Sequence, residues 1–170
     1  TDAEADVSSS EKRSRPVRVL HLRDSPWVDG PGRTILETAA RIDRSRVDYQ
    51  VGAFVSDRTA PHPLVDALRK RGLPVHAIED QRGVGRGMVS TFVDLLDSQQ
   101  IDILHPSEFR SNVLGLLCRR RRPVKLVSTA HGWIGNDVRG RAYIFADRVL
   151  LCRFDRVILV SHAMRRRLPS

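Results

Sequence analysis

Apolar residues gather in short runs at six places along this chain of 170 residues. The runs are rich in valine, isoleucine and leucine, as parallel strands are when both faces of their sheet are covered. They therefore predict six buried strands. The first begins at Val17, and the others lie at Val47–Val55, Leu73–Ile78, Ile101–His105, Val124–Ala130 and Asp155–Val160.

Between these runs the apolar residues return at the spacing of a helix. One set stands at i, i+1, i+4 and i+7, on a single helix face: Ile35, Leu36, Ala39 and Ile42. The same spacing predicts further helices at His62–Gly72, at Met88 to Leu96, at Phe109 to Leu117 and at Arg139–Phe154, and a last helical turn capped by Ser161. Gly72 stands where a left-handed helix end favours glycine, and Ser107 is a candidate N-cap.

Strands that alternate with helices in this way predict an α/β fold, with a parallel sheet and helices on both of its faces. The length suits one domain with a full core. Residues 1–15 lack apolar periodicity and carry a serine cluster, so they are expected to form a disordered tail. The folded domain is predicted over residues 16–170.

The connection between the first strand and the first helix contains Gly30, Pro31 and Gly32. Pro31 suits a first helical position, because its missing N–H would have no partner there. A glycine turn between a strand and a helix directs backbone N–H groups and the positive end of the helix dipole at the loop, which favours a phosphate. The alternative is a tight connection without a ligand, since the full GxGxxG motif is absent.

In parallel sheets of this kind, ligands gather at the carboxyl ends of the strands. The predicted ends carry Gly30 and Gly32, the Gln81–Gly87 loop, His105, His131 with Gly132, and Ser161. We interpret the Gln81–Gly87 loop as a flexible connection. Trp27, in the first loop, either contacts a ligand or packs on the surface. The convergence of these polar and glycine positions predicts a ligand site at this edge.

The chain carries a formal charge of +9, and without its acidic first 15 residues the charge is +10. Such a domain is attracted to nucleic acid, to an anionic membrane face or to phosphorylated ligands. A nucleic-acid partner is disfavoured, because no recognised binding motif or aromatic platform is found. No apolar run approaches the ~20 residues of a membrane span. We interpret Cys118 and Cys152 as buried free thiols, as in a cytosolic protein.

Two arginine clusters and three apolar loop residues predict peripheral association with the anionic cytoplasmic face of a membrane. They are Arg119–Arg122, Arg165–Arg167, Trp27, Trp133 and Ile134. The alternative interpretation is a solvated basic face. Either way, the expected location is cytoplasmic.

Four segments, in this order and at these spacings, resemble the N-terminal domain of the family-4 retaining glycosyltransferases. They are the opening strand with its glycine loop, Ile101–Gly115, Ser128–Trp133 and Asp155–Leu168. Enzymes of that family have two Rossmann-like domains that face each other (the GT-B fold). The resemblance implies a doubly wound sheet of about six strands that forms the acceptor-side half. The donor-binding C-terminal domain has no counterpart in these 170 residues, so the chain is expected to fold but not to catalyse alone.

The resemblance also implies roles for single residues. Gly30 and Gly32 correspond to the loop near the donor's diphosphate, although many members have adjacent glycines there. His131 corresponds to the histidine that reaches the donor sugar and the reaction centre. Residues of the acceptor side and the cleft are expected to include Trp27, His105, Gly132, Trp133, Arg139 and Ser161.

The implied activity is transfer of a hexose from a nucleotide-sugar to a glycan or lipid-linked acceptor, as in polysaccharide biosynthesis. No cofactor and no metal are expected, which agrees with the lack of a DxD-type carboxylate pair. The alternatives are a nucleotide- or phosphate-binding module without catalysis, a basic nucleic-acid-binding domain, and a sugar-nucleotide epimerase on the same fold.

Overall fold

The computed structural model describes residues 15–56, 61–80, 83–131 and 138–165, and within these ranges six strands alternate with six helices. The strands are β1 (Val17–Arg23), β2 (Val47–Val55), β3 (Val75–Glu79), β4 (Ile103–Pro106), β5 (Lys125–Ala130) and β6 (Arg156–Leu159). The helices are α1 (Gly30–Arg41), α2 (Pro63–Lys70), α3 (Arg86–Ser98), α4 (Phe109–Arg119), α5 (Val138–Leu151) and α6 (His162–Arg165).

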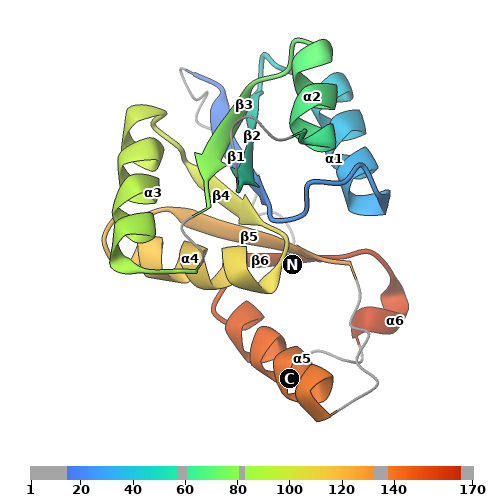
Figure 1. Cartoon of the computed structure of the whole chain (residues 1–170), viewed down its shortest axis with the longest axis vertical. Coiled ribbons are helices and arrows are strands. Elements are labelled where there is room, and N and C mark those ends of the chain that lie inside the picture. The colour runs from blue at the N-terminus through green and yellow to red at the C-terminus, as the bar shows by residue number, and fades with distance from the viewer. Residues whose placement is uncertain (1–14, 57–60, 81–82, 132–137, 166–170) are drawn as a thin grey trace, which may run out of the picture.

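The strands form one sheet in the order β3-β2-β1-β4-β5-β6, and every neighbouring pair is parallel (Figure 1). The chain starts in the middle of the sheet, proceeds outward to β3, crosses back through α3 to β4, and continues to β6. The direction of winding therefore reverses between β1 and β4, where ligands bind in such sheets. The predicted α/β fold with a six-stranded parallel sheet is confirmed.

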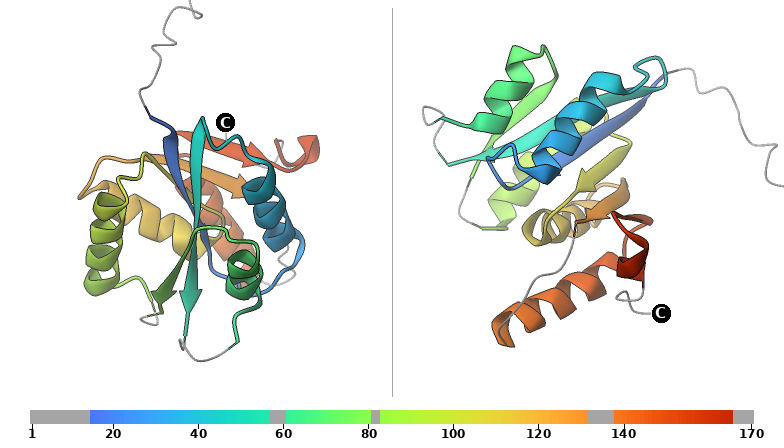
Figure 2. Two further views of the ribbon diagram at one scale, coloured as in Figure 1. Left: turned by 90° about the horizontal axis from the view of Figure 1, so that it is seen from above. Right: turned by 90° about the vertical axis from the view of Figure 1, so that its right-hand side faces the viewer.

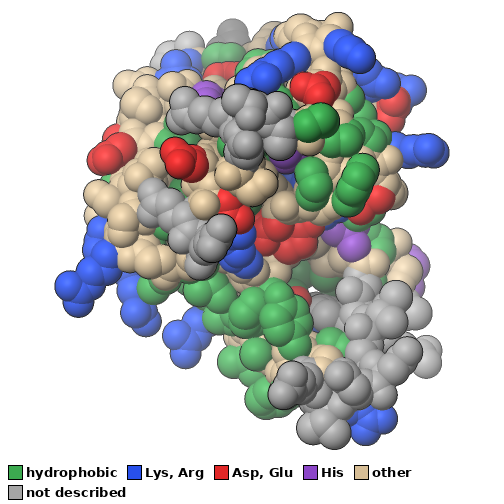
Figure 3. All heavy atoms as spheres, viewed as in Figure 1, with side chains coloured by type: hydrophobic (Ala, Val, Ile, Leu, Met, Phe, Trp, Pro, Cys, Tyr) green, Lys and Arg blue, Asp and Glu red, His purple; other side chains and the backbone are tan. Residues whose placement is uncertain are grey.

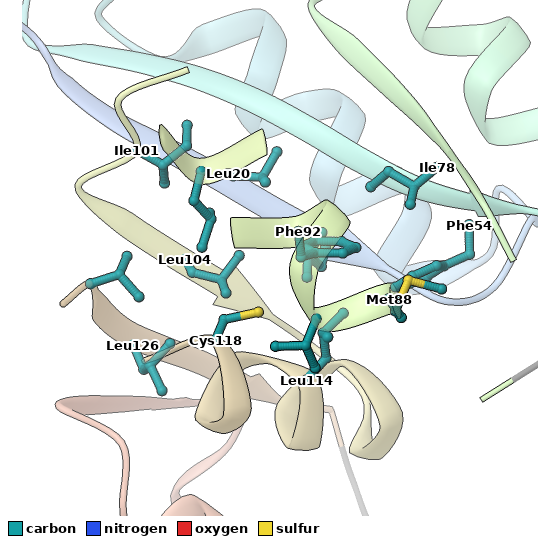
Figure 4. Packing of buried hydrophobic residues seen from close by; sticks show 14 residues of the cluster. Leu20, Phe54, Ile78, Met88, Phe92, Ile101, Leu104, Leu114, Cys118 and Leu126 are labelled. Atoms are coloured by element: carbon teal, nitrogen blue, oxygen red, sulfur yellow. The ribbon is translucent and has the colours of Figure 1, made fainter. Parts of the chain in front are cut away.

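Helices cover both faces of the sheet (Figure 2), so alternate residues of each strand face different helices. On one face α1 and α2 pack against β1 and β2, and Ile35, Leu36 and Ala39 of α1 are buried there as the helix spacing predicts. On the other face α3 and α4 cover Leu20 and other strand residues in the largest core cluster (Figure 4). Helix α5 joins α4 on this face, with Leu151 packed against Ala130 of β5.

Two helix ends show how local chemistry sets the boundaries. Gly72 has a φ of +64°, and its N–H donates to the carbonyl of Arg69 at 2.9 Å, so the left-handed end of α2 is confirmed. The prediction that Ser107 caps α4 is wrong. The N-cap is Glu108, in a capping box with Ser111, because the Ser107 hydroxyl lies 2.6 Å from Nε2 of His21 instead.

The two cysteines differ in exposure. Cys118 is buried in the main core, where burial raises the pKa of its thiol to about 12. Cys152 is exposed, so the prediction of a second buried thiol is wrong. The physical reason is that α5 ends at Leu151, whose side chain reaches the core, and Cys152 lies in the turn that follows.

Candidate active site

Two histidines lie side by side where β1 and β4 approach their carboxyl ends. The sheet register pairs His21 with His105, and both side chains project from the same face. Their rings are stacked, with centroids 4.1 Å apart and planes inclined by 22°. The parallel register of β1 and β4 is therefore sufficient to place the two histidines side by side, and no loop residue is needed to position them.

Hydrogen bonds fix both rings. Nδ1 of His21 lies 2.6 Å from the Tyr49 hydroxyl, Nε2 of His21 reaches Ser107 as described above, and Nε2 of His105 lies 2.9 Å from Oγ1 of Thr129. Burial lowers the pKa of His21 well below its usual range and lowers the pKa of His105 to about 4. Both imidazoles are therefore neutral at neutral pH, which allows them to stack at this distance.

His131 directly follows β5 and is half-buried at the same edge. Burial lowers its pKa, the positive charge of Arg23 lowers it further, and Asp29 acts in the opposite direction. The ring is therefore also neutral at neutral pH. A neutral imidazole near a strand end can both donate and accept a hydrogen bond, as a catalytic group must.

Arg23, the last residue of β1, is buried although it is charged, with 4% of its surface exposed. Its guanidinium pairs with Asp29 at 2.8 Å and with Glu108. Asp29 is the N-cap of α1 and Glu108 is the N-cap of α4. Arg23 therefore ties the N-termini of two helices together, and its charge is compensated by two carboxylates.

The ion pair between Arg23 and Asp29 affects the glycine loop at the start of α1. Oδ1 of Asp29 accepts a hydrogen bond from the N–H of Gly32 at 3.0 Å, so a carboxylate already lies at the N-terminus of α1. A Cβ added at Gly32 would lie 2.6 Å from the carbonyl oxygen of Trp27, whereas one added at Gly30 would meet nothing within 4 Å. Gly32 is thus required by its own loop, and the contact of both glycines with a diphosphate stays a prediction.

A pocket of about 270 Å³ opens beside Arg23 and His131, between the carboxyl ends of the strands and helices α4 and α5. Three of its lining residues form a hydrogen-bonded chain. Oγ of Ser128 donates to Oδ1 of Asn112 at 3.0 Å, and Nδ2 of Asn112 donates to Oδ1 of Asp147, also at 3.0 Å. The chain connects β5, α4 and α5.

Aromatic rings from the same two helices also line the pocket. The ring centroids of Phe109 and Tyr143 lie 4.3 Å apart, and Tyr143 is 54% exposed. The pocket thus combines aromatic faces with carboxylate, amide and hydroxyl groups. These groups can hydrogen-bond and pack against a ligand that carries many hydroxyls. Acidic and histidine side chains gather at the hollow above α5 in Figure 3.

The remaining predicted residues lie as follows. Trp27 is 64% exposed in the β1–α1 loop. Ser161 is exposed and directly precedes α6, and its carbonyl accepts a hydrogen bond from the N–H of Met164 at 3.2 Å. Arg139 belongs to the first turn of α5. Gly132 and Trp133 lie outside the described residues.

Sequence reasoning missed residues that the structure places at this site: His21, Arg23, Glu108, Asn112 and Asp147. A signal existed for the first two. His21 and Arg23 are two residues apart in an apolar strand, so they face the same side near its carboxyl end. The other three depend on how α4 and α5 pack, which no local pattern shows.

Two absences hold for the described part of the chain. Its histidines, cysteines and carboxylates form no group of three or more that could hold a metal ion. None of its helices is both long and apolar enough to cross a membrane.

Residues 29–169 match the model of the glycosyl transferase 4-like domain family. This range contains Gly30 and Gly32, both helix N-caps held by Arg23 and every pocket-lining residue except Arg23 itself. It leaves out residues 1–28, which include β1, and Ser170. No curated protein matches the chain in sequence.

Several solved structures share the fold. Alr3699/HepE of Anabaena, in complex with UDP and glucose, has a TM-score of 0.61 at 18% identity, over 81% of this chain and 36% of its own. MurG of Acinetobacter baumannii has 0.60 at 11% identity, over 85% and 41%. A UDP-N-acetylglucosamine 2-epimerase has 0.61 at 12% identity, over 87% and 43%. The chain thus covers less than half the length of each of these proteins.

Proposed function

The chain belongs to the family of glycosyl transferase 4-like domains, and we propose that it is the acceptor-side domain of a retaining, metal-independent glycosyltransferase. The enzyme would move a hexose from a nucleotide-sugar donor to a glycan or lipid-linked acceptor. The observation that carries this proposal is the polar and aromatic pocket beside the neutral His131, at the carboxyl edge of the sheet. The UDP and glucose bound by Alr3699/HepE support a nucleotide-sugar donor.

In this proposal the acceptor enters the pocket between α4 and α5. Asp147 and Glu108 accept hydrogen bonds from its hydroxyls, and the exposed ring of Tyr143 contacts the face of a sugar. The local charge favours such an uncharged ligand, since Arg23 is neutralised by its two carboxylates and the histidines are neutral. A diphosphate would find Asp29 at the N-terminus of α1 and would reach the loop at Gly30 rather than Gly32.

His131 would lie where the acceptor meets the donor sugar. Its neutral ring can hydrogen-bond the sugar and stabilise charge that develops in the transition state. The nucleotide would be held by parts of the protein outside these residues. No step is assigned to a metal, because the sequence lacks a paired-aspartate motif. Trp27, His105, Trp133, Arg139 and Ser161 complete the proposed cleft.

A second candidate function is epimerisation of a nucleotide-sugar, which the structural similarity to a UDP-N-acetylglucosamine 2-epimerase favours. Sugar transfer and epimerisation differ in their substrates and products. Transfer consumes an acceptor and releases a nucleoside diphosphate, whereas an epimerase interconverts sugars without a second sugar substrate.

The test is a product assay on the longest natural form of the protein, with a panel of nucleotide-sugars and with glycan and lipid-linked acceptors. We expect release of nucleoside diphosphate that depends on acceptor, and the His131→Ala variant should lower turnover at least about a hundredfold at an unchanged melting temperature. Epimerised donor, acceptor-independent hydrolysis, or full turnover of the variant would contradict the proposal.

A further inference from the structure

Two polar residues beside the pocket occupy buried positions where apolar side chains would pack as well. Asn112 of α4 is 2% exposed and Ser128 of β5 is 1% exposed. The neighbouring inward residues of β5, Leu126 and Ala130, are buried in apolar clusters. A buried polar side chain costs stability unless it is hydrogen-bonded, and an apolar pair of similar shape is often equally stable. The polar pair therefore points to a role other than stability.

The hydrogen bonds of this pair have a fixed direction. Asp147 of α5 carries a carboxylate, which accepts hydrogen bonds and cannot donate one. The amide nitrogen of Asn112 therefore faces Asp147, at 3.0 Å, and the amide oxygen faces Ser128, whose hydroxyl donates to it at 3.0 Å. Each residue thus orients the next, from the sheet through α4 to α5.

This chain of hydrogen bonds ends at a carboxylate that lines the pocket. Tyr143 and Asp147 stand at i and i+4 on α5, so they share one face of the helix, and both line the pocket. An aromatic ring can pack on the apolar face of a sugar. A carboxylate accepts several hydrogen bonds, so Asp147 can bind ligand hydroxyls while Asn112 holds it.

The size and charge of the pocket limit what can enter it. Its volume of about 270 Å³ lies just below the range of about 300–1,000 Å³ for drug-sized ligands, which leaves room for one sugar ring. Asp147 and Glu108 both line it, and the only cation among its described lining residues, Arg23, is paired with Glu108 and Asp29. A sugar ring that carries a carboxylate or a phosphate would be repelled.

We propose that Asn112 is a positioning residue, which holds the Asp147 carboxylate in place to accept hydrogen bonds from one uncharged sugar ring, and that Ser128 orients Asn112. Asp147 then determines specificity for the terminal sugar of the acceptor. The inference rests on the proposed function, because it places the acceptor in this pocket. If the hydrogen bonds only tied α5 to α4, an apolar pair would serve sugar binding equally well.

The test is titration of the isotope-labelled 170-residue chain with methyl hexopyranosides and with methyl glycosides of hexuronic acids, followed by amide chemical shifts. A ligand of this size, at ordinary efficiency, has a dissociation constant of about 1 mM. We expect a neutral hexoside to bind in that range and to shift the amides of residues that line the pocket. The uronic acids should bind at least about tenfold more weakly.

The first variant combines Asn112→Leu with Ser128→Ala. Both partners become apolar, so no buried amide or hydroxyl is left unpaired, and the melting temperature should stay the same or rise. Binding of the hexoside should nevertheless weaken about fivefold to tenfold, because the Asp147 carboxylate loses its hydrogen-bond donor.

The matched control is Gln50→Leu. It removes another buried amide, whose oxygen lies 2.7 Å from Nε2 of His76, and neither residue lines the pocket. Its hexoside binding should equal that of the unchanged chain. The melting temperature of each variant establishes that it is folded.

The second variant, Asn112→Asp, gives a readout that a structural role would not change. It puts a second carboxyl group beside Asp147, and like charges raise the pKa of the pair, so that the two groups share a proton as the pH falls. At pH 8 the groups repel each other, and hexoside binding should weaken at least about tenfold. At pH 6 the shared proton replaces the amide hydrogen and binding should recover. His131 and Glu108 face the same pocket in both proteins, and the unchanged chain should bind equally at both pH values.

Several results would overturn the proposal: no binding of any neutral hexoside, equal binding of the uronic acids, unchanged affinity in the apolar variant, an equal loss in the control, or no recovery of Asn112→Asp at pH 6. The proposed function fails separately. Sugar binding that depends on Asn112, in a protein that transfers no sugar, would contradict only the transferase. Sugar transfer with binding indifferent to Asn112 and Ser128 would contradict only this inference.

Discussion

Arg23 at the pocket and Arg120 at the C-terminal end of α4 show two opposite uses of arginine in one domain. Arg23 is buried and held by Asp29 and Glu108, whereas Arg120 is exposed and lacks a carboxylate partner among the described residues. The overall charge of +9 is therefore no guide to the site. The pocket presents carboxylates and the neutral imidazole of His131, whereas Arg120 carries its positive charge on the outside of the domain.

The largest difference between the two arginines should be in stability. Arg23→Met leaves the Asp29 and Glu108 carboxylates close together without a cation between them. Removal of one partner of a buried pair costs about 3–5 kcal/mol, and since both carboxylates are partly exposed we expect about 2–4 kcal/mol. Urea unfolding measures it. The free energy of unfolding of Arg120→Met should stay within about 0.5 kcal/mol of that of the unchanged chain. Equal losses of stability for the two variants would contradict the distinction between a buried, paired Arg23 and an exposed Arg120.

A smaller effect should distinguish the two glycines of the loop beside Arg23. Gly32→Ala forces a methyl group against the Trp27 carbonyl, a backbone atom that cannot turn aside, and we expect a loss of about 1–3 kcal/mol. Gly30→Ala enters open space and should change stability by less than about 0.5 kcal/mol. Thermal unfolding of both variants is the measurement. If both variants are equally stable, the short distance between position 32 and the Trp27 carbonyl does not require glycine there, and the prediction is wrong.

The smallest predicted effect depends on pH and on the stacked histidines. The pKa of His105 is about 4 in the folded protein and about 6.5 in an unfolded chain. The unfolded state therefore binds more protons as the pH falls from about 6.5 to 4, and the folded state loses stability over that window. His105 alone should contribute a loss of roughly 1–2 kcal/mol between pH 7 and pH 5.

The control for this prediction is His105→Asn, which removes the titrating group. Its free energy of unfolding should fall less between pH 7 and pH 5 than that of the unchanged chain. Parallel pH profiles for the two proteins would mean that the pKa of His105 is the same in the folded and unfolded states, which would contradict this prediction.

The sequence predicted the fold well because the strands are buried and their apolar runs are continuous. The six strands, the helix face of Ile35, Leu36 and Ala39, and the cap at Gly72 all follow from local patterns. His105 and His131 were expected at one edge because the carboxyl ends of parallel strands meet there.

The site itself depended on contacts between distant segments. Glu108, not Ser107, is the N-cap of α4. The Ser107 hydroxyl is hydrogen-bonded to His21, and the Glu108 carboxylate is held beside the helix by its ion pair with Arg23. Equally, Arg119 and Arg122 belong to one basic run, yet both are paired with acids from other segments, Asp155 and Asp97. Only the packing of α4 on the sheet determines which arginines remain free.

The measurement that tests the central claim most directly compares residues 1–170 with the longest natural form of the protein. Calorimetric titration with nucleotide-sugars is run beside a transfer assay. We predict that the short chain folds, binds donors no better than weakly and shows no turnover. Positioning of the donor can supply ~7–11 kcal/mol of a barrier, and in the proposed function this domain would form only one wall of the cleft. Micromolar donor affinity or multiple turnovers by residues 1–170 alone would contradict its assignment as the acceptor-side domain.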